Sequence, residues 1–91
     1  MTLDEFKILA TADGLSPILA AMWWDAQGNW ERAHEIAQAV EHSEGDWVHA
    51  YLHRKEGDLS NADYWYRRAG RTRPEGSLRE EWTTIVATLM A

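Results

Sequence analysis

The chain has 91 residues, 45% of them hydrophobic and six of them tryptophan, which is enough apolar material for one packed domain and too much for a disordered tail. It has no cysteine, so disulfides, thiolate metal sites and cysteine nucleophiles are excluded. Its formal charge of −6 argues against general affinity for nucleic acid, because non-specific binding to phosphates depends on positive charge.

The start of the chain and its hydropathy predict a cytoplasmic location. Residues 1–12 carry two acids and one lysine around a short apolar set, which lacks the basic start and long apolar run of a signal peptide. No stretch approaches the roughly 18 apolar residues of a membrane-spanning helix. We therefore expect a cytoplasmic protein with no membrane partner.

Two helix starts are marked near the N-terminus. Thr2 and Glu5 form a capping-box pattern, and the apolar residues behind them fit one face of a short helix that ends at Asp13, within residues 1–14. Ser16 and Pro17 then open a second helix in the favoured way, with a hydroxyl at the cap and proline in the first turn. This second helix is apolar nearly all round, so we expect it to be central.

A glycine separates the second helix from a third. Gly28 breaks the apolar segment, and the two helices form a first hairpin over residues 15–45. Residues 42–46 read as a tight turn, and Ser43 or Asp46 is the expected cap of a fourth helix.

The second half of the chain predicts another hairpin and a final helix. Gly57 turns the fourth helix into a fifth, so the second hairpin covers residues 46–74. Ser77 and Glu80 form another capping box and open an amphipathic sixth helix within residues 75–91.

The two predicted hairpins repeat one another at an offset of 29 residues. The offset aligns three pairs of small residues, namely Ala21 with Ala50, Gly28 with Gly57, and Ala33 with Ala62. Alanine allows a partner helix to come close, so Ala33 and Ala62 should face the interior.

The second hairpin resembles the tetratricopeptide repeat and its Sel1-like relatives. Six of its residues meet that pattern: Ala50, Gly57, Ala62, Tyr66, Ala69 and Pro74. The first hairpin meets the pattern in part, because Ala37 replaces the aromatic residue and Val40 replaces the second alanine. The 29-residue period is also shorter than the 34 residues of that family.

The resemblance implies an all-α fold, a right-handed stack of two hairpins with an N-terminal helix and a C-terminal capping helix that covers the last hairpin. It also implies a non-catalytic protein–protein interaction module, in which the first helix of each hairpin lines a groove for a partner segment. Carried over to this chain, the groove residues are Trp47, Tyr51, Arg54 and Lys55, with Ile18, Met22 and Asp25 from the first hairpin. The side chains by which chaperone-binding members clamp a terminal carboxylate are absent.

A second candidate surface is rich in arginine. It comprises Tyr64, Trp65, Arg67, Arg68 and Arg71, followed by Arg73. Arginines near a helix C-terminus complement its dipole, and their stems shield aromatic rings. The alternative is a site for an acidic protein partner, because arginine and tryptophan often dominate binding energy. A nucleic-acid interface that adds Arg54 and Lys55 is a third interpretation, and it predicts binding that weakens steeply with salt.

A histidine pair is the only candidate metal site. His49 and His53 are four residues apart on one predicted helix, the spacing at which two imidazoles can share a metal ion. The third ligand would come from a neighbouring helix, with His34, Glu35 or Asp63 as the choices. The repeat comparison puts both histidines at packing positions, so two core side chains are the plainer interpretation, and metal binding is the alternative.

The sequence gives little support for catalysis. The serines precede or open helices, which capping explains, and no acid pair lies in an apolar segment that would shift its pKa. We therefore expect no enzyme activity and no cofactor. Four tryptophans lie on apolar stripes, whereas Trp47 and Trp65 are flanked by polar residues and are expected to be partly exposed, on a surface for a partner or a homodimer.

Overall fold

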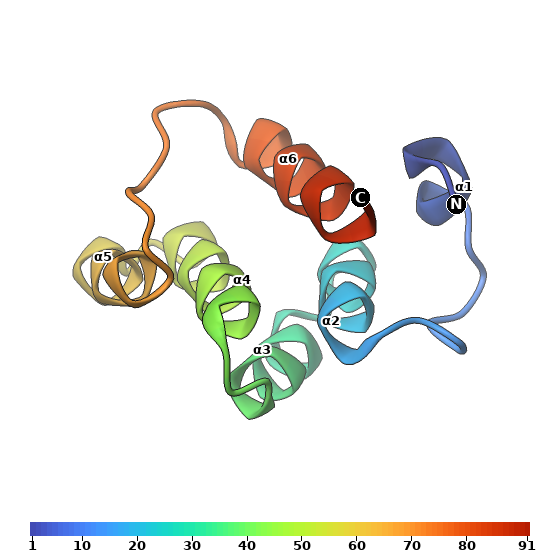
Figure 1. The fold of residues 1–91 in the computed structure, drawn as a ribbon, viewed down its shortest axis with the longest axis horizontal. Helices are drawn as coiled ribbons and strands as arrows, with labels where there is room; N and C mark the ends of the chain where they lie inside the picture. Colours follow the sequence, from blue (N-terminus) through green and yellow to red (C-terminus); the bar gives the residue numbers. More distant parts are fainter.

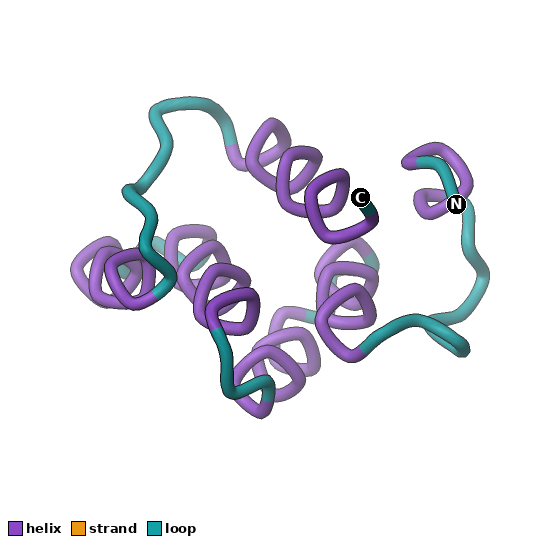
Figure 2. The backbone as a smooth tube through the Cα atoms, in the orientation of Figure 1, coloured by secondary structure: helices purple, strands orange, loops and turns teal.

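The computed structural model describes all residues 1–91 and contains six α-helices and no strand (Figures 1 and 2). The helices are α1 (Leu3–Lys7), α2 (Pro17–Ala26), α3 (Trp30–Ala39), α4 (Ser43–Lys55), α5 (Leu59–Arg68) and α6 (Leu78–Met90). The all-α prediction is confirmed. None of the helices combines the length and the apolar character needed to cross a membrane.

Three of the predicted helix starts are confirmed by their capping hydrogen bonds. Thr2 and Ser77 each accept from the backbone N–H three residues on, and the glutamate at that position returns the bond to complete a capping box. Ser16 caps α2 with Pro17 behind it. The first helix is shorter than predicted, because α1 ends at Lys7 and not near Asp13.

The start of α4 corrects the sequence prediction. The helix begins at Ser43, so residues 43–46 are helical and do not form a turn, and the cap is the ring of His42, whose Nδ1 accepts from the N–H of Glu44. Gly45 lies in this first turn, at a position where a side chain would not fit. A Cβ on Gly45 would lie 2.0 Å from the carbonyl oxygen of Val40.

α2 pairs with α3 and α4 pairs with α5 as two helical hairpins, and their turns are the same. Gly28 and Gly57 have φ of +84° and +91°, a conformation that glycine adopts without strain. In both turns an N–H donates to the carbonyl five positions earlier in the chain: Asn29 donates to Trp24 and Asp58 donates to His53, each at 3.0 Å. These are Schellman bonds, which satisfy carbonyls at the helix end.

The alanines that were expected to face the interior are buried. Ala33 and Ala62 are both fully buried, where α3 packs on α2 and α5 packs on α4. α3 also packs on α4, so the two hairpins lie side by side and share one hydrophobic core.

The sixth helix packs on α4 of the last hairpin, and it also reaches the first hairpin through α2. Figure 1 shows α6 beside α2 and α4, and it packs on these two helices and on α1. Ile85 and Val86 of α6 are fully buried, and the indole N–H of Trp82 donates to the carbonyl of Met22 at 3.2 Å. This is the side of α2 and α4 that the resemblance assigned to a partner groove, so the chain fills it with its own helix.

Candidate functional site

Most of the predicted groove residues are buried or are bonded to other residues of the chain. Trp47 and Tyr51 have exposed fractions of 5% and 2%, so the expectation that Trp47 is partly exposed is wrong. Its ring is covered by Arg71, whose guanidinium carbon lies 3.4 Å from the ring centroid. Because this cover comes from the loop after α5, the polar neighbours of Trp47 in the sequence gave no sign of it.

Asp25 and Lys55 form one of two buried polar networks beneath α6. Asp25 is buried near the end of α2, and its two carboxylate oxygens accept from the hydroxyl of Tyr51 at 2.7 Å and from Nζ of Lys55 at 2.8 Å. Burial and the neighbouring carboxylate raise the pKa of Tyr51 well above its usual value. Lys55 is thus paired with a buried acid, although its own side chain reaches the surface.

Glu81 and Arg54 form the second network. Glu81 is buried on α6 and accepts from the hydroxyl of Tyr66 at 2.5 Å and from Nη1 of Arg54 at 2.8 Å. Arg54 also donates to the carbonyl of Gly76. Burial, together with the bond to Glu81, raises the pKa of Tyr66 well above its usual value. Arg54 therefore joins α4 to α6 and is not free for a partner.

The arginine surface remains open on α5. Tyr64 has an exposed fraction of 46%, and Arg67 is exposed and forms no ion pair. Arg68 lies over the half-buried Trp65, with its guanidinium carbon 5.1 Å from the ring centroid, and its Nε is 3.7 Å from Asp46. The outer side of α5 thus combines aromatic area with arginine heads that water can reach.

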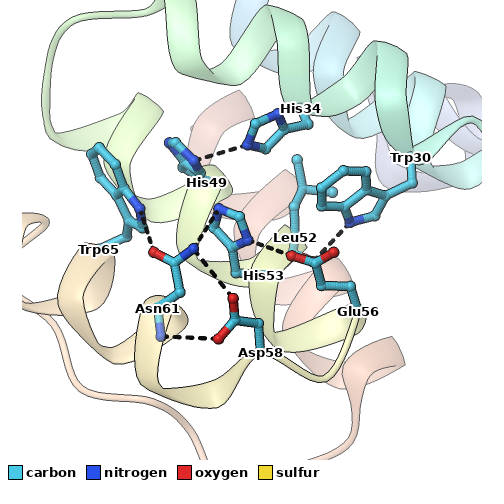
Figure 3. Close-up of polar contacts among 9 residues, drawn as sticks. All are labelled: Trp30, His34, His49, Leu52, His53, Glu56, Asp58, Asn61 and Trp65. Atoms are coloured by element: carbon cyan, nitrogen blue, oxygen red, sulfur yellow. Dashed lines mark hydrogen bonds and ion pairs between the residues drawn. The ribbon is translucent and has the colours of Figure 1, made fainter.

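The structure brings a third histidine to the predicted pair. His34 comes from α3, whereas His49 and His53 come from α4, and Figure 3 shows the three rings meeting between these helices. Nε2 of His34 lies 3.0 Å from Nε2 of His49. One potential ligand nitrogen from each ring can be chosen so that all three lie within 4.8 Å of one another.

The rings are held by aromatic stacking. Trp30 stacks on His34 with centroids 4.8 Å apart, and Trp65 stacks on His49 at 4.0 Å. His53 stacks on the other imidazole of α4 at 4.7 Å. The indole N–H of Trp30 donates to the carbonyl of Leu52 at 2.8 Å, which fixes this ring across the seam between the hairpins.

Glu56 and Asn61 contact opposite nitrogens of His53, and both contacts place its proton on Nδ1 (Figure 3). The indole N–H of Trp65 can only donate, and it donates to Oδ1 of Asn61 at 3.1 Å. The amide nitrogen of Asn61 therefore faces Nε2 of His53, at 3.4 Å, and donates to it. The proton of His53 is then on Nδ1, which donates to Oε2 of Glu56 at 2.6 Å, and Nε2 keeps its lone pair.

Two of the three imidazoles are kept neutral by their surroundings. Burial, followed by the charges that His34 and His53 would carry, lowers the pKa of His49 to about 4. Burial, followed by the charge that His53 would carry, lowers the pKa of His34. A neutral imidazole is the form that binds a metal ion.

Sequence reasoning found part of this cluster. His34 was one of three candidates for the third ligand, and the other two lie elsewhere, because Glu35 pairs with Arg32 and Asp63 pairs with Arg73. Trp30, Glu56 and Asn61 were missed as members. The spacing of Glu56, three residues after His53, is the signal that would have found it.

Comparisons with protein-family models, with curated proteins and with solved structures gave no match.

Proposed function

We propose that this protein is a non-catalytic interaction module of the tetratricopeptide-repeat-like type, a right-handed stack of two hairpins that binds an acidic segment of a partner protein through the outer side of α5. The binding surface consists of Tyr64, Trp65, Arg67, Arg68 and Arg71. The groove of the family is not the proposed site, because α6 lies in it.

The observation that supports this proposal is the combination of exposure and charge on α5. Tyr64 is one of the few large hydrophobic side chains that are exposed, and Arg67 beside it has no acidic partner within the chain. Four arginines and no acid occur within residues 67–73 of a chain whose formal charge is −6. Such a local excess of cations favours carboxylates on a partner, and arginine can bind them with two hydrogen bonds.

The experiment compares two variants with the same change in charge. Arg67→Ser with Arg71→Ser removes two cations of the proposed surface, whereas Lys7→Ser with Arg32→Ser removes two cations elsewhere. Binding is measured by fluorescence anisotropy with a panel of labelled peptides that carry several aspartates or glutamates around one aromatic residue, at two salt concentrations.

We expect acidic peptides to bind the wild type and the Lys7/Arg32 variant alike, and to bind the Arg67/Arg71 variant at least about tenfold more weakly, since each charge-assisted hydrogen bond contributes about 1.5–3 kcal/mol. Equal loss in both variants would mean that only net charge matters. Tighter binding of single-stranded DNA than of any peptide, or self-association of the purified chain through α5, would replace this proposal.

A further inference from the structure

We propose that His34, His49 and His53 bind one divalent transition-metal ion, for which Zn²⁺ is the reference, at the seam between the two hairpins. This site is separate from the arginine surface of α5 and independent of its proposed function.

The geometry of the nitrogens fits a single ion. Zinc binds imidazole nitrogen at about 2.0–2.1 Å in tetrahedral geometry, which places two bound nitrogens roughly 3.4 Å apart. The Nε2 atoms of His34 and His49 lie 3.0 Å apart, and the ligand atoms of the three residues lie within 4.8 Å. Small rotations of the rings would bring all three to one ion.

His53 already has the arrangement of a metal ligand. Its Nδ1–H donates to the carboxylate of Glu56 at 2.6 Å, and its Nε2 lone pair faces away from that bond. Histidine ligands commonly donate their second nitrogen to a carboxylate, which fixes the ring and makes the other nitrogen more basic. The amide of Asn61, at 3.4 Å from Nε2, is a weak contact that an ion would replace.

The charges around the cluster do not oppose a bound cation. No lysine or arginine pairs with the three rings, and the one carboxylate bonded to them is Glu56. Nearby aspartate also offers oxygens, since His53, Glu56 and Asp58 lie within 4.8 Å. Asp58 is occupied as the cap of α5, however, and both acids are exposed, so the imidazole set is the better site.

The ligand set indicates the class of ion. Imidazole favours Zn²⁺, Cu²⁺, Ni²⁺ and Co²⁺, whereas Mg²⁺ and Ca²⁺ prefer oxygen. Three histidines leave a fourth position of a tetrahedral ion to water or another ligand. Because His34 is only half-buried, we expect this position to lie on its side of the cluster.

The first test uses the wild-type chain. After treatment with a chelator, the protein is titrated with Zn²⁺ by calorimetry and with Co²⁺ by visible absorption. We expect one equivalent of each ion, intense d–d absorption typical of four-coordinate Co²⁺, displacement of Co²⁺ by Zn²⁺, and no competition from Mg²⁺. The absence of both heat and absorption at tenfold excess of metal would overturn the proposal.

The second test uses matched histidine variants. His34→Gln and His49→Gln should each weaken Zn²⁺ binding by more than the roughly 10–100-fold that the loss of an outer-sphere partner costs. His42→Asn removes the one histidine outside the cluster and keeps a side chain that can cap α4, so its affinity should match the wild type. If His49→Gln does not fold, the His34→Gln variant, which changes a half-buried residue, still tests the proposal.

The third test examines the partner of His53. Glu56→Gln should weaken binding by about 10–100-fold, whereas Glu35→Gln, which alters an exposed acid on α3, should leave it unchanged. Binding that survives His34→Gln but is lost in Asp58→Asn would assign the ion to the acidic group instead and overturn the three-histidine site.

Discussion

At the 29-residue offset, α3 corresponds residue for residue to α5, and α2 corresponds to the last ten residues of α4. The glycine turns and buried alanines are the same in both hairpins, yet the polar side chains are not. Asp25 of α2 and Arg54 of α4 occupy equivalent positions and bind opposite partners, Lys55 and Glu81. The first hairpin has Ala20 and Trp24 where the second has His49 and His53. The turn glycines and the buried alanines are therefore what the two hairpins share, whereas equivalent positions elsewhere carry side chains with different charge and hydrogen-bonding groups.

The largest expected difference between the hairpins concerns their ion pairs. Arg54→Met leaves the carboxylate of Glu81 buried without a cation, which should lower the free energy of unfolding by about 3–5 kcal/mol. Asp25→Asn keeps an acceptor for Tyr51, and Lys55 can turn to water, so its cost should be about 1 kcal/mol. Urea denaturation measures the free energy of unfolding of both variants. Equal losses would contradict the inference that the buried Glu81 needs its cation more than Asp25 does.

The next largest effect concerns Gly45, in the N-terminal part of α4 that has no counterpart in α2. Alanine normally stabilises a helix relative to glycine, but Gly45→Ala should destabilise the protein by about 1–3 kcal/mol, because the new Cβ meets the carbonyl of Val40. Gly76→Ala is the control, since its Cβ would meet only the flexible end of Glu80. Stabilisation by Gly45→Ala would show that the first turn of α4 can move away.

The buried tyrosines of the second hairpin should make the stability of the protein depend on pH in the alkaline range. Tyr51 and Tyr66 correspond to Met22 and Ala37, which do not titrate. Both tyrosines have a raised pKa, so above about pH 10 the unfolded chain loses protons that the folded chain retains, and stability falls as pH rises. We expect on the order of 1 kcal/mol per tyrosine over the first pH unit above 10.

Thermal melts between pH 8 and 11 measure this slope. The double variant Tyr51→Phe with Tyr66→Phe should flatten it. A slope that is the same in both proteins would show that other groups cause the loss of stability.

The smallest effects should be equal in the two hairpins. Gly28→Ala and Gly57→Ala both place a Cβ in open space but in a left-handed conformation, so each should cost about 1 kcal/mol. Chemical denaturation of both variants tests whether the turns are equivalent. A difference greater than about 0.5 kcal/mol, the usual limit of additivity for independent sites, would mean that one turn has tertiary contacts that the other lacks.

Local signals in the sequence predicted most of the helices. Capping serines and threonines, turn glycines and the alanines of the hairpins act within a few residues or within one repeat, so their patterns are visible in the chain. The start of α4 was missed because His42 acts as its cap, and histidine is not among the residues that usually do so.

Contacts between distant segments were not predictable in the same way. The position of α6 depends on which apolar face it meets, and the pattern of α6 alone does not show that α2 shares this face with α4. The burial of Trp47 depends on Arg71, and the identity of the third histidine depends on how α3 lies against α4. In each case the deciding neighbour is more than ten residues away.

The bond from Trp82 to Met22 joins residues 60 positions apart. Each hairpin, by contrast, closes within one repeat, and short loops cost less chain entropy than long ones. We therefore expect the hairpins to form early in folding and α6 to dock late. The indole of Trp82 would then report the last step, because it enters its final environment only when α6 docks on α2.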